Sequence, residues 1–456
     1  MESLLESGRV RDDYINLVVS MPSGRCVSVS VLESEPIVEL KIASQKTLGH
    51  PFLRLASPDA RPLDPRGSLA LSGLRDGDSI SAIAQQPKLA ATSRAFALWC
   101  VGGDRIATWG DPHCGGNSSS VQDQLSNVQQ ICATSSAFAA ISADGNVVTW
   151  GTPGNGGDSS GVQDQLRNVQ QICGTRFAFG AILADGTVVT WGFPAYGGDS
   201  STVQHQLKNV QQICATSCAF AAILADGSVV TWGDPERGGD SSRVQDQLKN
   251  VQQISGTSVA FAAILADENV VTWGDPDSGG DSSRVQHQLK NVQQICATSS
   301  AFAAISADGS VLTWGRPAYG GDSSRVQRQL KNVQQICGAY RAFAAVLADG
   351  TVLTWGDPHR GGDSSRVQRQ LKNVLQIYST AFAFAAILVD GSVVTWGLSL
   401  QGGDSSGVQH QLKNVQQIYG TNNALAAILV DGTVVAWGNP DSGGDSSSVQ
   451  GQFLYM

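Results

Sequence analysis

The chain has 456 residues, a formal net charge of −9, 15% charged residues and 51 glycines. An acidic total argues against nucleic acid or an anionic membrane as the main partner, because either would require a basic footprint. No apolar stretch is long enough to span a membrane, and the first residues lack the basic-then-apolar pattern of a secretory signal. We therefore expect an intracellular protein, cytoplasmic or nuclear, that does not contact a membrane.

After a flexible N-terminus at residues 1–13, residues 14–86 predict a small α+β domain. Strands are expected over residues 15–21, 26–31, 52–55 and 79–83. In the third of these strands, Leu53 and Leu55 should point inward and Arg54 outward, because side chains alternate between the faces of a strand.

A helix is expected between the second and third strands of this domain. Ser34 can cap its start, it runs to about Leu48, and Gly49 ends it. Val38 and Ile42 stand four residues apart and should face the sheet.

The order of hairpin, helix, strand, turn and strand, together with the ending Leu74-Arg75-Asp76-Gly77-Asp78, resembles the ubiquitin-like (β-grasp) fold. Two features depart from that family. The segment continues through Pro87 without a free Gly-Gly tail, and ubiquitin presents an apolar residue at the place of Arg54. A small α+β domain with no role in the ubiquitin pathway is the alternative.

Residues 88–456 consist of nine copies of a 41-residue unit, of which the first is degenerate. A tryptophan marks each copy, and we expect these rings to be buried structural residues. They are Trp109, Trp150, Trp191, Trp232, Trp273, Trp314, Trp355, Trp396 and Trp437. One repeat position carries five cysteines but also tyrosines, which predicts packed, reduced thiols and not disulfides or metal ligands.

One unit, residues 210–250, shows the predicted plan. Strands are expected over 210–215, 219–224 and 228–233, and an Asp-Gly turn joins the second strand to the third. A turn-rich loop follows, and then a fourth segment over 241–250. Val244 and Leu248 lie on one face of this segment whether it is a helix or a strand, so its type stays open.

The motif Asp-Gly-x-Val-x-x-Trp-Gly, as in residues 171–198, is similar to the regulator of chromosome condensation repeat. That repeat also occurs in HERC-type ubiquitin ligases, and the resemblance implies a β-propeller of roughly seven blades. The expected fold is therefore an all-β, propeller-like repeat array. We favour a closed ring, and an open or spiral array is the alternative, because nine units exceed the usual four to eight blades.

Two repeat positions vary freely: the turn between the first and second strands and the loop after the third. Antiparallel strands alternate in direction, so both positions should lie on the same face of the array. We predict a protein-binding face there, because binding residues favour loops and hot spots favour Tyr and Arg. The candidate residues are Tyr196, Arg237, Tyr319, Tyr340, Arg341, His359 and Arg360. Neutral drift at exposed loops is the alternative explanation.

Charged rows have structural explanations. Asp240 and its equivalents should cap the fourth segment, and Arg243 and its equivalents should pair with them.

No catalytic motif, cofactor site or metal site is found, so we expect no enzyme and no cofactor. The expected function is that of a monomeric protein-interaction scaffold, associated by resemblance with the ubiquitin pathway as a HERC-like substrate-recruiting or regulatory protein. A guanine-nucleotide exchange module for a small GTPase is the alternative.

Overall fold

The computed structural model describes residues 14–103 and 105–453, which form two compact units. The first contains residues 14–87, 431–433 and 450–453, and the second contains the described residues of 88–430 and 434–449. The predicted flexible start, residues 1–13, lies outside the described residues. No described helix is long and apolar enough to cross a membrane.

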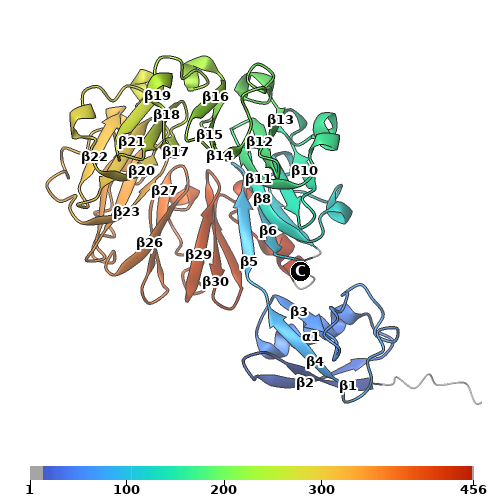
Figure 1. Cartoon of the computed structure of the whole chain (residues 1–456). Helices are drawn as coiled ribbons and strands as arrows, with labels where there is room; N and C mark the ends of the chain where they lie inside the picture. Colours follow the sequence, from blue (N-terminus) through green and yellow to red (C-terminus); the bar gives the residue numbers. More distant parts are fainter. Residues whose placement is uncertain (1–13, 104, 454–456) are drawn as a thin grey trace, which may run out of the picture. The chain divides into compact units, whose positions relative to one another are not determined.

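The first unit is a four-stranded sheet packed against one helix (Figure 1). Its elements are β1 (Tyr14–Ser20), β2 (Cys26–Leu32), α1 (Ile37–Leu48), β3 (Leu53–Ala56) and β4 (Ser79–Ala84). The strand order is β2-β1-β4-β3, with β4 parallel to β1 and antiparallel to β3. Leu53 and Leu55 are buried and Arg54 is exposed, as the alternation predicts.

The start of α1 differs from the prediction. Ser34 is not the cap; the N-cap is Pro36, and no side chain caps the helix. The first amides instead donate to backbone carbonyls of a later loop, as Ile37 N does to Gly67 O at 2.9 Å. Such bonds replace a side-chain cap, because they satisfy the same unpaired amides. Gly49, with φ of 69°, ends the helix as expected.

The buried face of α1 also differs from the prediction. Val38 and Ile42 are only half-buried. The buried residues are Ile37, Leu40, Lys41, Ser44, Gln45 and Leu48. Ile37 is the first helical residue, so the stripe that faces the sheet follows its spacing of three and four residues and not that of Val38.

The second unit contains nine three-stranded antiparallel sheets, one from each repeat, which confirms the predicted propeller-like array. The first strands of repeats 1 to 9 are β5 (Pro87–Ala91), β8 (Val128–Ala133), β11 (Val169–Gly174), β14 (Val210–Ala215), β17 (Val251–Gly256), β20 (Val292–Ala297), β23 (Val333–Gly338), β26 (Val374–Ser379) and β29 (Val415–Gly420). The second strands are β6 (Ala95–Cys100), β9 (Ala137–Ser142), β12 (Ala178–Leu183), β15 (Ala219–Leu224), β18 (Ala260–Leu265), β21 (Ala301–Ser306), β24 (Ala342–Leu347), β27 (Ala383–Leu388) and β30 (Ala424–Leu429). The third strands are β7 (Ile106–Gly110), β10 (Val147–Gly151), β13 (Val188–Gly192), β16 (Val229–Gly233), β19 (Val270–Gly274), β22 (Val311–Gly315), β25 (Val352–Gly356), β28 (Val393–Gly397) and β31 (Val434–Gly438).

The hydrophobic core of the second unit lies between repeats and not within them. One cluster joins Ala221 and Val229 of repeat 4 to Ile254 and Trp273 of repeat 5, and Leu248 fills the space between the two sheets. Each repeat buries its neighbour's sheet, so a single repeat would leave one apolar face in water.

The nine tryptophans of the repeat are buried, with exposed fractions between 2% and 4%. Trp273 packs on the ring of Phe261 with centroids 5.1 Å apart, and its indole Nε1 donates to Gly238 O of the preceding repeat at 3.0 Å. The same indole bond recurs in every repeat. Trp150 to Trp437 therefore bond to the loop of the preceding repeat, and Trp109 of repeat 1 bonds to the loop of repeat 9.

In repeats 1 to 8 the fourth segment is neither α-helix nor strand, whereas in repeat 9 it leads into the short helix α2 (Gln450–Phe453). In repeat 4 it consists of 3-10 turns, such as Gln245–Gln247, and ends at Asn250 in the left-handed region with φ of 55°. Gln245 Nε2 donates to Val229 O at 2.9 Å, so a side chain, and not a fourth strand, bonds to the edge of the third strand. An edge protected in this way is not open to pairing with another chain.

The aspartate that begins the fourth segment caps it, but the predicted ion pair with the following arginine is not formed. Asp240 Oδ1 accepts from Ser242 N at 2.8 Å, and seven other repeats make the same bond. The ion pairs of the described residues include none between Asp240 and Arg243 or their equivalents. Both side chains are exposed, and an exposed pair gains too little to hold two mobile side chains together.

These caps predict an acid-labile array. The backbone hydrogen bond from Ser242 lowers the pKa of Asp240 below its ordinary value, and the equivalent aspartates shift in the same direction. A lowered pKa in the folded state means that the carboxylates stabilise the fold above their ordinary pKa and that this stabilisation is lost as the pH falls through the folded pKa. We expect the urea concentration at the midpoint of unfolding to decrease when the pH is lowered below about 4. Asp240→Asn should lower the midpoint at neutral pH and lose its effect in strong acid, whereas an equal effect at both pH values would contradict the assignment.

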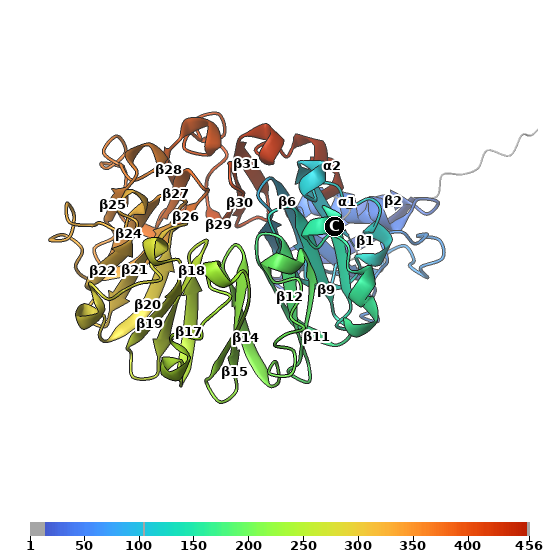
Figure 2. The ribbon, with the colours of Figure 1, turned by 90° about the horizontal axis from the view of Figure 1, so that it is seen from above.

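A series of backbone hydrogen bonds links the turns between first and second strands. The amide of each turn donates to a carbonyl of the next repeat's turn at 2.9–3.2 Å, through Ser93, Ser135, Arg176, Ser217, Ser258, Ser299, Tyr340, Ala381 and Asn422. The series returns to its start, because Asn422 N donates to Ser93 O at 2.9 Å. Trp109 Nε1 of repeat 1 also donates to Gly443 O, at 2.9 Å, in the loop of repeat 9. Both ribbon views place the ninth repeat, in red, beside the first (Figures 1 and 2).

Candidate protein-interaction site

The two variable positions of the repeat lie at the same end of the sheets. In repeat 4, Arg237 of the loop donates from Nη1 to Cys218 Sγ of the turn at 3.4 Å. Thr216 Oγ1 accepts from Ala219 N at 2.9 Å and donates to Arg237 O at 3.2 Å, so one hydroxyl ties turn and loop together. We call the surface made by these turns and loops the turn face.

Repeat 7 lacks this threonine and carries Ala339 in its place. We expect Ala339→Thr to raise the free energy of unfolding by about 1 kcal/mol, because the hydroxyl gains hydrogen bonds to Ala342 N and Arg360 O. Urea denaturation measures the change. Thr216→Ala should lower stability by a similar amount, and a destabilising Ala339→Thr would show that the site cannot accept the hydroxyl.

Six side chains from repeats 6 to 8 form a continuous ladder of alternating arginine and aromatic groups on the turn face. The members of this Arg-aromatic ladder are Arg316, Tyr319, Arg341, Tyr340, Arg360 and Phe382. Arg341 Cζ lies 4.4 Å from the Tyr319 ring centroid, and Arg360 Cζ lies 4.7 Å from that of Phe382. Guanidinium groups over aromatic faces are attracted by the ring quadrupole, which holds these long side chains in place.

Asp357 is the carboxylate that contacts the ladder. Its Oδ2 lies 3.8 Å from Arg341 Nη1 and 3.6 Å from Arg360 Nε. Two of the three ladder arginines thus share one aspartate. Arg316 adds to the excess of positive charge at the ladder, because other repeats carry an aspartate at its position. These aspartates are Asp111, Asp234, Asp275 and Asp357.

The structure brings together four of the seven predicted residues: Tyr319, Tyr340, Arg341 and Arg360. Two further members, Arg316 and Phe382, were not predicted. The charge reversal at Arg316 is a signal that comparison of the repeats could have used. Phe382 stood in a variable turn but was not selected, because Tyr and Arg were preferred there.

The other three predicted residues lie outside the ladder. Tyr196 packs between Phe177 and Phe193, at centroid distances of 5.2 and 5.1 Å. Arg237 lies 3.3 Å from Asp234. His359 is exposed in a 3-10 turn, where its amide donates to Asp357 Oδ1 at 3.0 Å.

The centre of the turn face is hollow. A cavity of about 1250 Å³ is lined by turn residues of all nine repeats. Arg176, Arg237 and Arg316 line it together with Asp275, and Tyr319, Tyr340 and Phe382 of the ladder reach it. The lining of the depression thus holds three arginines and one aspartate, in a protein whose total charge is negative.

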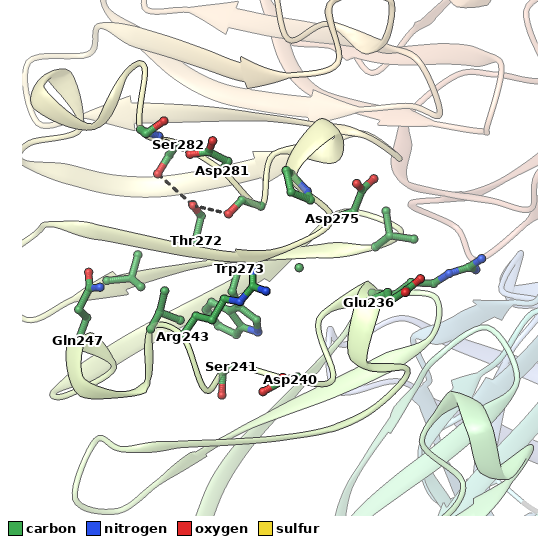
Figure 3. Close-up of a pocket in the computed structure, with 18 of the residues that line it drawn as sticks. Glu236, Asp240, Ser241, Arg243, Gln247, Thr272, Trp273, Asp275, Asp281 and Ser282 are labelled. Carbon is green, nitrogen blue, oxygen red and sulfur yellow. Dashed lines mark hydrogen bonds between the residues drawn. The ribbon is translucent and has the colours of Figure 1, made fainter.

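A second cavity, of about 1140 Å³, lies in the groove between repeats 4 and 5 (Figure 3). Asp240 and Arg243 line one side, and Thr272, Trp273 and Ser282 line the other. A cavity of about 820 Å³ with equivalent residues lies between repeats 3 and 4. Because the groove recurs with the repeat, it is a property of how neighbouring repeats pack and not a specific site.

The described residues include potential metal ligands and buried cysteines. The structure groups no three His, Cys, Asp or Glu side chains of these residues in a way that could hold a metal ion. Burial raises the pKa of the Cys132, Cys214 and Cys337 thiols to about 11, so they remain protonated. These three cysteines form no disulfide, as the exchange of this repeat position with tyrosine predicts.

No protein-family model and no curated protein matches the sequence. Among solved structures, Prp20p from Saccharomyces cerevisiae, described with its binding to Gsp1p and histones, is 14% identical and covers 59% of this chain and 82% of its own, with a TM-score of 0.37. Yeast RCC1 (Prp20) bound to Kap60 is 16% identical and covers 60% and 80%, with a TM-score of 0.38. The computationally designed protein Ika8 is 16% identical and covers 68% and 95%, with a TM-score of 0.34. Identities and TM-scores are low, so the fold described above rests on the strand pairing of the chain itself.

Proposed function

We propose that this protein is a non-enzymatic interaction scaffold that binds a protein partner through its turn face. The observation that carries the proposal is the Arg-aromatic ladder. Tyr and Arg are the residues most enriched at energetic hot spots, and here three aromatic and three arginine side chains are ordered by one another on one face. The ladder occupies three of nine repeats, which gives the array one distinctive sector.

We also propose that the array is a closed ring of nine blades. The turn hydrogen bonds that return from Asn422 to Ser93, and the bond from Trp109 to Gly443, support closure. A ring leaves no first or last repeat with an uncovered sheet face, and it gives the turn face a fixed shape.

We further propose that the protein acts in the ubiquitin pathway. The order β2-β1-β4-β3, with a helix between β2 and β3, supports a ubiquitin-like assignment for residues 14–86. The motif resemblance to HERC-type proteins supports the same context for the array. Together they suggest a protein that recruits a substrate or regulates a ligase.

Affinity purification with mass spectrometry tests the proposal. Charge reversal of Arg341 and Arg360 together should remove specific partners, whereas Lys249→Glu with Lys290→Glu, at the exposed opposite end of the sheets, should not. Unchanged partners for the arginine variant would refute binding at the turn face. If the protein captures a small GTPase and accelerates its nucleotide release, its function is that of an exchange module and not of a scaffold.

A further inference from the structure

The arginines of the ladder are held by aromatic rings more than by carboxylates. Arg341 and Arg360 keep side-chain exposures of 33% and 30% while they lie over Tyr319 and Phe382. A guanidinium that stacks on a ring keeps its N–H donors at its edge, in the fork that matches a carboxylate. The ladder therefore presents ordered donors whose hydrogen bonds Asp357 does not saturate.

Arginines also line the central depression next to the ladder. Arg176, Arg237 and Arg316 reach it, whereas Asp275 is the acidic residue in its lining. Charges more than about 8 Å apart are largely screened at physiological salt, so a short ligand responds to this local excess and not to the net charge of −9.

The arrangement favours carboxylates over nucleic acid. Binding of single strands relies on bases stacking on free aromatic faces, but guanidinium groups already lie over the Tyr319 and Phe382 rings. A nucleic acid also needs a long basic groove, whereas the surface outside the ladder carries an acidic row that includes Asp199, Asp240 and Asp281.

We propose that the turn face binds an acidic peptide segment of its partner, whose carboxylates bind Arg316, Arg341 and Arg360 while the chain enters the central depression. This proposal rests on the proposed interaction function and specifies its ligand. Asp357 acts in it as an internal competitor, since it occupies the space between two of the arginines.

Fluorescence anisotropy with the full-length protein tests this inference. The probes are three labelled twelve-residue peptides in which glutamate, glutamine or lysine alternates with glycine, and a single-stranded oligothymidine of matched charge. The glutamate peptide should bind, more weakly as salt rises, and the glutamine and lysine peptides should not. Arg341→Gln or Arg360→Gln should weaken binding about tenfold each, whereas Arg328→Gln and Arg369→Gln, exposed in the fourth segments, should leave it unchanged.

Asp357→Asn provides the sharpest test. It keeps the Oδ1 acceptor for His359 N but removes the competing charge, so it should tighten binding of the glutamate peptide several-fold. Weaker binding by Asp357→Asn, equal binding of the glutamine peptide, or tighter binding of the oligothymidine would overturn the inference. If no peptide binds but charge reversal of Arg341 and Arg360 still removes partners from cells, the acidic ligand is wrong and the interaction function stands.

Discussion

Replacing Trp273 by alanine should lower the free energy of unfolding by about 3–5 kcal/mol, as expected when a large buried aromatic side chain is removed from a packed core. The ring is 4% exposed and lies in a cluster shared by repeats 4 and 5. Its loss leaves a cavity and an unpaired carbonyl at Gly238, which accepts the indole N–H. Urea denaturation followed by circular dichroism gives the change.

Trp273→Phe is the matched control. Phenylalanine keeps an aromatic ring against Phe261 but cannot donate to Gly238 O, so we expect a smaller loss, dominated by about 1 kcal/mol for the hydrogen bond. Equal losses for the two variants would show that the hydrogen bond, and not the packing of the ring, holds the repeats together.

The repeat architecture could be predicted because each part of it has a local signal. The spacing of the tryptophans gave the period, and the Asp-Gly turns and alternating residues gave the strands. The second strands are apolar throughout and are buried on both faces. The fourth segment could not be resolved, because Val244 and Leu248 fit a helix and a strand equally well. The bond from Gln245 to the backbone of Val229 is a tertiary contact, which periodicity does not encode.

The site could be predicted only in part for a related reason. Strand direction alone places both variable positions on one face. Which side chains meet on that face depends on how neighbouring repeats are inclined to each other, because Arg341 belongs to the turn of repeat 7 and Tyr319 to the loop of repeat 6. The predicted start of α1 was wrong for the same reason, because it also depends on a tertiary contact. The backbone of a distant loop takes the place of the expected Ser34 cap.

Gly320→Ala should destabilise the array by about 2–5 kcal/mol. Gly320 has φ of 93°, where a side chain costs about 1–2 kcal/mol, and a Cβ there would lie 2.5 Å from Phe343 Cδ2. Gly402→Ala is the control for the backbone term. Gly402 has φ of 100°, but a Cβ there would lie 3.1 Å from the flexible end of the Leu425 side chain. Gly402→Ala should therefore lose mainly the free energy of holding a non-glycine residue at a positive φ. If both variants lose the same free energy of unfolding, the close packing of the Gly320 loop against the Phe343 side chain contributes nothing to stability.

Gly443→Ala applies this comparison to the junction between the last repeat and the first. In a closed ring, a Cβ at Gly443 would lie 2.6 Å from Phe96 Cδ2, so the variant should lose as much stability as Gly320→Ala. In an open array, Phe96 would not be there, and the loss should not exceed that of Gly402→Ala. Urea denaturation of the three variants therefore measures closure by the size of one steric clash. A Gly443→Ala value near the Gly402→Ala value would mean that the ring is open, and the turn face would then lack the enclosed centre on which an acidic ligand depends.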